Sequence, residues 1–186
     1  MTPARRAGFT LLELVVVLAI GAVLMSIALP DLRGMVRSHQ LKAAVNDLFG
    51  AIDLARTQAI ARGRRVQLVP DGDAAPEWRH GWVVFVDEDG DRRPGAGEEV
   101  IMRHGPLAEG IALDAAFSTQ QGRPYLAYNS MGRSCSDTSS LAARWGTLSM
   151  ALGGQTRRIK INMLGRARIC DPARDAASCG GAGQDP

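Results

Sequence analysis

The pattern of apolar and polar positions begins with a long apolar run near the N-terminus. Within residues 9–29 the polar side chains are those of Thr10, Glu13 and Ser26 alone. As an α-helix these 21 residues span roughly 30 Å, the thickness of the hydrocarbon core of a bilayer. Arg5 and Arg6 precede the run, which favours a cytoplasmic N-terminus with the rest of the chain exported. The pattern therefore predicts a transmembrane helix over residues 9–30.

A second pattern, with helical spacing, follows Pro30. Between Met35 and Ala61 apolar residues recur three and four positions apart: Leu41, Val45, Leu48, Ile52, Ala55 and Ala59. This spacing predicts an amphipathic helix with one buried face. Proline often kinks a long helix without ending it, and Gly63 is a suitable stop. We expect one long helix, with a membrane half and an amphipathic half over residues 31–63.

Beyond Gly63 the pattern changes to the alternation that is typical of β-strands. About seven short strands are predicted, at residues 65–69, 81–86, 100–103, 111–113, 125–128, 147–152 and 157–161. Gly153 and Gly154 predict a hairpin turn between the last two. The chain therefore has an α+β pattern, with a long helix before an antiparallel β domain over residues 64–172. Residues 173–186 are small, polar and glycine-rich, which predicts a C-terminal tail that is poorly ordered beyond any disulfide.

Glu13 is an expensive residue inside an apolar helix. A charge there costs about 2.5–3.5 kcal/mol on insertion scales, so it needs a partner. Cleavage between Gly8 and Phe9 would supply one, the new α-ammonium group of Phe9. A plain membrane anchor is the alternative.

The segment that carries this carboxylate, GFTLLELVVVLAIGAVL with Pro30 after it, resembles the class III signal of type IV pilins and type II secretion pseudopilins. The resemblance implies the pilin fold, removal of residues 1–8 as a leader by a prepilin peptidase, and methylation of Phe9. It also implies that Glu13 pairs with the N-terminal amine during filament assembly. The protein would lie in the bacterial inner membrane as a single-pass protein, its C-terminus in the periplasm, before it joins a pilus or pseudopilus.

Charge is distributed unevenly along the chain. The 186 residues carry a net charge of +3, but residues 71–122 hold 11 acidic groups against 4 arginines, and residues 123–186 hold 9 basic groups against 4 aspartates. A basic C-terminal third suggests an anionic partner. A solvated surface is the plainer interpretation of the same asymmetry.

Three cysteines are available for a disulfide on the oxidising side of the membrane. Cys170 and Cys179 would close a short loop, and we favour that pair. Cys135 paired with either of them is the alternative, and one thiol is left over in any case. The three histidines show no ligand spacing with the cysteines, so we predict no metal site.

An acidic loop over residues 87–91, with Glu98 beyond it, is similar to a calcium loop. An EF-hand needs glycine at its sixth position, where this chain has Arg92. We therefore predict a solvated hairpin between two strands. The sequence has no G-x-S-x-G elbow, no Walker loop and no H-E-x-x-H motif, so we expect neither an enzyme nor a cofactor.

The strongest candidate for a binding site is the segment Gly165-Arg166-Ala167-Arg168. Gly165 suits a tight turn, and in an extended chain Arg166 and Arg168 project from the same side, where they can bind successive phosphates. Arg157, Arg158, Lys160 and Arg174 lie nearby in sequence and could widen the basic surface. The alternative is an edge strand that uses arginine to prevent aggregation.

Three segments resemble the GspH/FimT branch of minor pilins and pseudopilins. They are LFGAIDLARTQAIARGR at residues 48–64, WVVFVD at residues 82–87 and GRARIC at residues 165–170. In FimT-like minor pilins a C-terminal G-R-x-R motif binds DNA during natural transformation, and Gly165, Arg166 and Arg168 match it position by position. The resemblance implies sequence-independent binding to the DNA backbone and assembly with other pilin subunits.

Two further interpretations remain open. The chain could be a GspH-like minor pseudopilin of a type II secretion system, or a priming pilin that binds no ligand. The sequence shows no evident aromatic stacking platform, so double-stranded and single-stranded DNA are equally expected as ligands.

Overall fold

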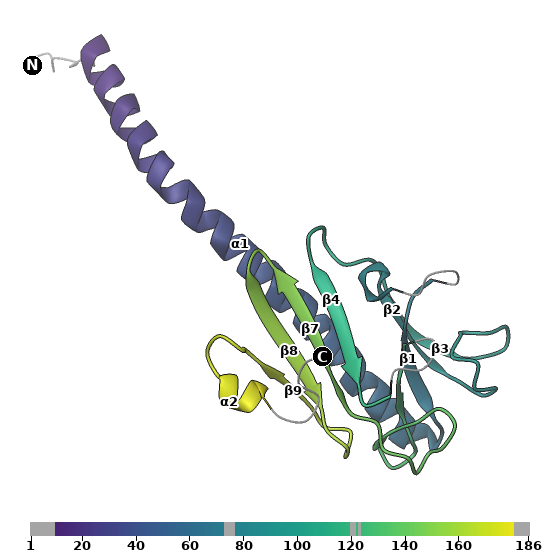
Figure 1. Ribbon diagram of the computed structural model, residues 1–186. Coiled ribbons are helices and arrows are strands. Elements are labelled where there is room, and N and C mark those ends of the chain that lie inside the picture. The colour runs from purple at the N-terminus through teal and green to yellow at the C-terminus, as the bar shows by residue number, and fades with distance from the viewer. Residues whose placement is uncertain (1–9, 73–76, 120–121, 123, 181–186) are drawn as a thin grey trace, which may run out of the picture. The chain divides into compact units, whose positions relative to one another are not determined.

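The computed structural model describes residues 10–72, 77–119, 122 and 124–180 (Figure 1). A long helix, α1 (Leu11–Arg62), comes first and is followed by strands. It ends where the sequence predicts, because Gly63 adopts φ 63° and donates its N–H to the carbonyl of Ile60. The chain divides into two compact units, Met1–Arg37 and Ser38–Pro186, and α1 contributes residues to both.

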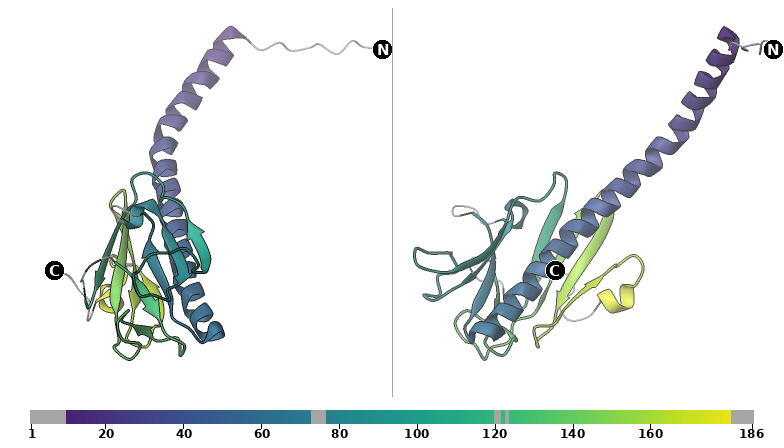
Figure 2. Two further views of the ribbon diagram at one scale, coloured as in Figure 1. Left: turned by 90° about the vertical axis from the view of Figure 1, so that its right-hand side faces the viewer. Right: turned by 180° about the vertical axis from the view of Figure 1, so that it is seen from behind.

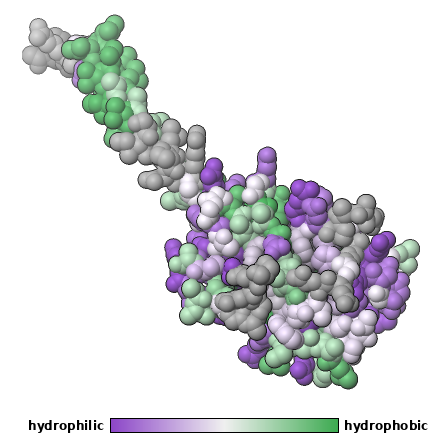
Figure 3. Space-filling view, viewed as in Figure 1, coloured by the Kyte–Doolittle hydropathy of each residue, from purple (hydrophilic) through white to green (hydrophobic). Residues whose placement is uncertain are grey.

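The first unit contains the apolar part of α1. Its large apolar side chains are exposed, from Leu11 at 81% to Met25 at 67%, and this surface is strongly hydrophobic in Figure 3. Among the described residues, no helix combines the length and apolar character needed to cross a membrane. The predicted transmembrane segment, residues 9–30, starts at Phe9, which lies outside the described residues. That this segment spans a membrane stays a prediction.

The second unit contains two antiparallel sheets beside the C-terminal half of α1. The five-stranded sheet has the order β3-β2-β1-β5-β6, and the four-stranded sheet has the order β4-β7-β8-β9. The strands are β1 (Val66–Pro70), β2 (Trp82–Val86), β3 (Val100–His104), β4 (Ala112–Phe117), β5 (Leu126–Tyr128), β6 (Ser134–Cys135), β7 (Gly146–Leu152), β8 (Gln155–Ile161) and β9 (Ala167–Cys170). A 3₁₀ turn, η1 (Trp78–His80), precedes β2, and a short helix, α2 (Ala176–Cys179), follows β9.

One hydrophobic core joins the helix to both sheets. The predicted apolar face of α1 is buried from Leu41 to Ala59, and it lies along one side of the two sheets (Figure 2). The five-stranded sheet contributes side chains such as Val84, and the four-stranded sheet contributes Leu148 and Ile159. A second cluster, which includes Phe85, packs on the other side of the five-stranded sheet. Burial on both faces explains why β2 is apolar throughout and β1 is apolar except at Gln67, which is also buried.

The predicted α+β fold is confirmed, with differences at the weakest elements. Each of the seven predicted strands is present, most shifted by one or two residues, and Gly153 and Gly154 form the predicted hairpin turn. β6, β9 and α2 were not among the predicted elements, and β6 and α2 are so short that pairing or a crosslink defines each of them more than its own sequence does. β9 extends the four-stranded sheet through the segment that carries the two candidate arginines.

Candidate nucleic-acid interface

Gly165 occupies a turn between β8 and β9 that accepts no other residue without strain. Its φ is 78°, and a Cβ placed on it would lie 2.5 Å from the carbonyl oxygen of Gly132 and 2.8 Å from the backbone nitrogen of Ser134. Asn162 holds the other side of the turn, since its Oδ1 accepts hydrogen bonds from the N–H groups of Leu164 and Arg166, each at 3.0 Å. The glycine of the motif therefore sets the position of the arginines after it.

Arg166 and Arg168 are exposed and lie on the same face of the β8–β9 hairpin. Ala167 between them turns toward the core, as the alternation of a strand requires. Both arginines line one cleft of about 520 Å³, which we call the arginine cleft; it is lined by Trp145, Lys160, Ile161, Asn162, Met163, Arg166, Ala167, Arg168 and Gly180. The structure thus brings the two predicted arginines to one concave surface.

Lys160 differs from the expectation that it presents its charge to a ligand. It is paired with Arg168 across β8 and β9, yet only 8% exposed. Its ammonium donates to the carbonyl oxygens of Cys179 at 2.9 Å and Gly180 at 2.8 Å. Arg158 is half-buried on the same face, opposite Cys170, and is not among the residues that line the arginine cleft.

The C-terminal segment forms one wall of the arginine cleft. The structure contains the predicted disulfide between Cys170 and Cys179, with the two Cα atoms 5.6 Å apart, and α2 lies beside β9 as a result (Figure 1). Cys135 is the remaining free thiol, and burial raises its pKa to about 11. Gly180 directly follows the disulfide and borders the cleft. Lys160 and the disulfide together fix that wall.

Two other basic residues of the C-terminal third are partly neutralised. Arg157 pairs with Asp171 at 3.0 Å, and Arg174 approaches the same carboxylate oxygen at 3.5 Å. Arg166, by contrast, forms no ion pair with any residue that the structure describes. The widened basic surface suggested by the sequence is therefore concentrated at the arginine cleft.

Sequence reasoning missed two residues of this site, Trp145 and Asn162. It found no aromatic platform, but the structure places the half-buried Trp145 in the same cleft as the two arginines. A signal was available. The Gly153–Gly154 turn sets the β7–β8 register, and counting back along both strands brings Trp145 opposite Asn162.

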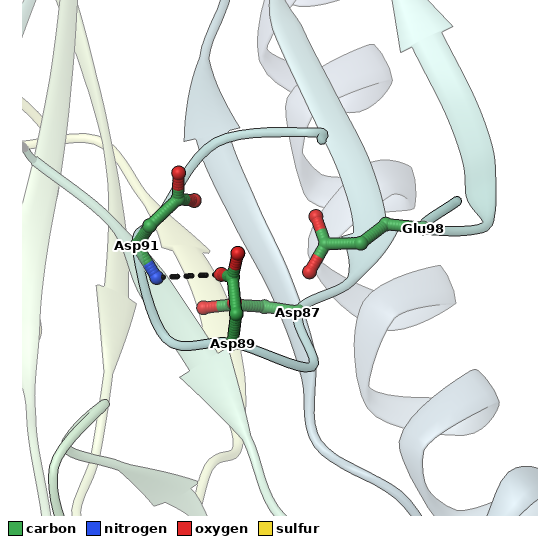
Figure 4. A group of neighbouring side chains, drawn as sticks. All are labelled: Asp87, Asp89, Asp91 and Glu98. Atoms are coloured by element: carbon green, nitrogen blue, oxygen red, sulfur yellow. Dashed lines mark hydrogen bonds between the residues drawn. The ribbon is translucent and has the colours of Figure 1, made fainter. Parts of the chain in front are cut away.

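The acidic loop connects the paired strands β2 and β3, so the predicted hairpin is present. One carboxylate oxygen from each of Asp87, Asp89, Asp91 and Glu98 lies within 4.8 Å of the other three (Figure 4). Each of these carboxylates accepts a hydrogen bond from a backbone N–H of the same loop, such as that of Gly90 to Asp87 at 2.8 Å. Asp87 is buried rather than solvated, and this burial raises its pKa. These bonds account for the shape of the loop.

The predicted processing residues lie at or before the start of α1. Gly8 and Phe9 fall outside the described residues. Glu13 is exposed in the first turn of α1, and its N–H donates to the hydroxyl of Thr10 at 3.2 Å.

Comparison with known proteins gives matches over both units. The family described as "Type II transport protein GspH" matches residues 44–165, and the prokaryotic N-terminal methylation motif matches residues 3–29. The pilin-like protein PilA1 of Thermus thermophilus is 34% identical over 169 residues, which cover 88% of this chain and 98% of that protein.

Solved structures share the fold at low identity. The type IV minor pilin FimU of Pseudomonas aeruginosa superposes with a TM-score of 0.54 at 17% identity, covering 73% of this chain and 92% of that one. The minor pseudopilin EpsH of the Vibrio cholerae type II secretion system gives a TM-score of 0.50 at 17% identity, covering 74% and 96%.

Proposed function

This chain belongs to the GspH family of minor type IV pilins and pseudopilins, and on that premise we propose that it is a minor pilin that binds DNA through the arginine cleft. Binding would be independent of base sequence and would serve DNA uptake in natural transformation. The observation that carries the proposal is the exposure of Arg166 and Arg168 on one face of the β8–β9 hairpin, where both line the same cleft. The turn before them fits only glycine, at position 165. The proposal assigns this chain stoichiometric binding and no catalysis.

The spacing of the two arginines suits a phosphate backbone. Residues two apart in a strand lie roughly 6.5 Å from each other on one face. Guanidinium groups form charge-assisted, often bidentate hydrogen bonds to phosphate, and backbone contacts of this kind carry no base-sequence information. A pair of such groups on a rigid strand therefore favours binding of successive phosphates along a nucleic acid.

The remaining basic residues have separate roles in this proposal. Lys160 is a positioning residue, because its ammonium holds the carbonyl groups of Cys179 and Gly180 at the wall of the cleft. Arg158 lies further along the same face of β8 and adds to the positive potential without lining the cleft.

We further propose the pilin route of processing and assembly for the N-terminal segment. The methylation motif over residues 3–29 supports cleavage after Gly8 and methylation of Phe9 by a prepilin peptidase. Glu13 then pairs with the new N-terminal amine as the subunit joins other pilin subunits. Before assembly the protein is held in the inner membrane by a single span, with its C-terminal unit in the periplasm.

A second candidate function is that of a GspH-like minor pseudopilin in a type II secretion filament. The match to the GspH family over residues 44–165 supports this assignment equally, because minor pilins and pseudopilins share fold and processing. The two candidates differ at the arginine cleft, since only the first requires it to bind DNA.

The test is a DNA titration of the full-length chain in a non-ionic detergent, which the exposed apolar residues of α1 require. Fluorescent duplex DNA is titrated at salt concentrations from about 50 mM to about 200 mM. Arg166→Gln/Arg168→Gln should weaken binding by at least about tenfold, because each charge-assisted contact contributes roughly 1.5–3 kcal/mol. The slope of log affinity against log salt should fall by about two.

Arg79→Gln/Arg103→Gln is the matched control. It removes the same charge from two exposed arginines, one in η1 and one in β3, which pair with Glu77 and Asp71. An equal loss of DNA affinity in both double variants would show that the net charge of the protein, and not the arginine cleft, controls binding. If the intact chain binds neither this duplex nor a single strand of the same length even at low salt, the pseudopilin assignment is the better one.

A further inference from the structure

We propose that the arginine cleft receives an unpaired base of single-stranded DNA on the indole of Trp145 while Arg166 and Arg168 hold the adjoining phosphates. This inference rests on the proposed function and specifies its ligand. It separates two parts of the same cleft, an aromatic part that recognises a base and a charged part that recognises the backbone.

The strand register places Trp145 on the same face as the arginines. Thr147 of β7 pairs with Lys160 of β8, which pairs with Arg168 of β9, so these three residues form one row across the sheet. Trp145 lies two residues before Thr147, and Arg166 two residues before Arg168. Their row continues through Asn162, whose N–H donates to the carbonyl of Arg166 at 3.1 Å.

The distances across this row suit one nucleotide. Neighbouring strands lie about 4.8 Å apart, so the backbones at Trp145 and Arg166 are separated by roughly 10 Å across β8. A base stacked on the indole therefore leaves its sugar and phosphate within reach of the long arginine side chains. The volume of about 520 Å³ lies within the range of pockets that take small organic groups.

The environment of Trp145 differs from that of the other two tryptophans. Trp78 and Trp82 are buried, at 5% and 0% exposure, and belong to the hydrophobic core. Trp145 is half-buried and lines the cleft together with Met163 and the arginines. An indole partly open to solvent between apolar contacts and positive charge is the combination found where proteins bind single-stranded nucleic acid.

Single strands fit this arrangement better than duplexes. Inside a duplex both faces of each base are covered by neighbouring bases, so an indole on the protein surface has no base to stack on. Duplex DNA can then use only the phosphate contacts of Arg166 and Arg168. A single strand can use those contacts and the indole together, and the stacked base should add roughly fivefold to a hundredfold in affinity.

The experiment compares three DNA probes on the full-length chain in non-ionic detergent. These are an oligothymidylate, an abasic strand of the same length and charge, and a duplex of that length. Trp145→Leu should weaken oligothymidylate binding by roughly fivefold or more and leave abasic and duplex binding unchanged. Trp145→Phe keeps an aromatic face and should retain most of the affinity. Oligothymidylate should also quench tryptophan fluorescence of the intact chain, and Trp145→Leu should lose that quenching.

The outcomes separate this inference from the proposed function. Equal binding of oligothymidylate and abasic strand, or an unchanged Trp145→Leu variant, would overturn the stacking role and leave phosphate binding by Arg166 and Arg168 intact. Loss of duplex binding in Trp145→Leu would show a structural role for the indole and would also overturn the inference. Failure of the intact chain to bind any probe would overturn the proposed function, and the stacking role with it.

Discussion

Arg144 and Arg166 belong to the same basic third of the chain, but the structure uses them in opposite ways. Arg144 is 2% exposed, and its guanidinium lies 4.3 Å from the ring centre of Phe117 and 3.8 Å from that of Tyr125. It donates hydrogen bonds to the carbonyl oxygens of Thr119 and Tyr125. Arg166 is exposed at the arginine cleft, and its hydrogen bonds to Asn162 in the local turn are made by its backbone N–H and carbonyl groups.

The comparison shows why a count of charges is a poor guide to a binding surface. The donors of Arg144 are used within the protein, where its guanidinium fills space between two aromatic rings. Burial lowers its pKa to about 10, so it remains charged at neutral pH but is not presented to a partner. The ammonium group of Lys160 is likewise used within the protein, because it donates to the carbonyl oxygens of Cys179 and Gly180. The positive charge available to an anionic partner is therefore much smaller than the sequence count implies.

The largest effect expected from this comparison is on stability. Arg144→Met should lower the free energy of unfolding by about 3 kcal/mol, because it leaves the buried carbonyl group of Tyr125 and the partly buried carbonyl group of Thr119 without their donor. Arg166→Gln/Arg168→Gln should change it by less than about 0.5 kcal/mol. Urea unfolding of the full-length chain in detergent, followed by circular dichroism, measures both.

Arg133→Met is the control for Arg144, since it replaces an exposed arginine of the same third by the same side chain. Its unfolding should match that of the parent chain within about 0.5 kcal/mol. A stability loss in the Arg166/Arg168 variant as large as that of Arg144→Met would remove the distinction between the two regions.

The next largest effect concerns the turn before the two arginines. Gly165→Ala should destabilise the protein by about 2–3 kcal/mol, because it combines a positive φ with a Cβ that collides with backbone atoms. Gly154→Ala, at φ 81° with no atom within 4 Å of the new Cβ, should cost only about 1 kcal/mol. Thermal unfolding of the two variants separates the effect of the Cβ collision from that of the positive φ. Equal losses of stability in both would show that the close approach at Gly165 does not destabilise the protein.

The smallest effect concerns Asp137, which accepts a hydrogen bond from Tyr125, the residue whose ring contacts Arg144. Burial raises its pKa, but hydrogen bonds from Tyr125 and Arg92 outweigh that effect and hold the pKa at about 2. A carboxylate with a lowered pKa stabilises the folded state above its unfolded pKa of about 3.9, and this contribution is lost as the pH falls toward 2. Asp137→Asn should therefore cost about 2 kcal/mol at pH 7, with the difference shrinking between pH 4 and pH 2.

Urea unfolding at several pH values measures this dependence. Asp114→Asn, which changes an exposed aspartate of β4, serves as the control and should show little difference from the parent chain at any pH. A cost for Asp137→Asn that is the same at pH 7 and pH 3 would contradict the assigned linkage.

Much of the fold could be predicted because its signals are local. The apolar spacing from Leu41 to Ala59 identified the buried face of α1, and alternation identified β7 and β8 with their Gly153–Gly154 turn. β6 could not be predicted, because two residues carry no periodicity and its pairing with β5 defines it. The pairing of Cys170 with Cys179 was favoured by the short loop between them, whereas the burial of Asp87 depends on the packing of neighbouring strands.

The sequence by itself determined the long helix, most strands and the position of the Gly165-Arg166-x-Arg168 motif, because periodicity and turn chemistry act over a few neighbouring residues. Only the tertiary structure decided which basic side chains are open to a ligand. Burial depends on strands that meet from distant parts of the chain, and it placed Arg144 among aromatic rings and Lys160 beneath the C-terminal segment. The same packing brought Trp145 to the cleft, where side chains far apart in sequence share one face of a sheet.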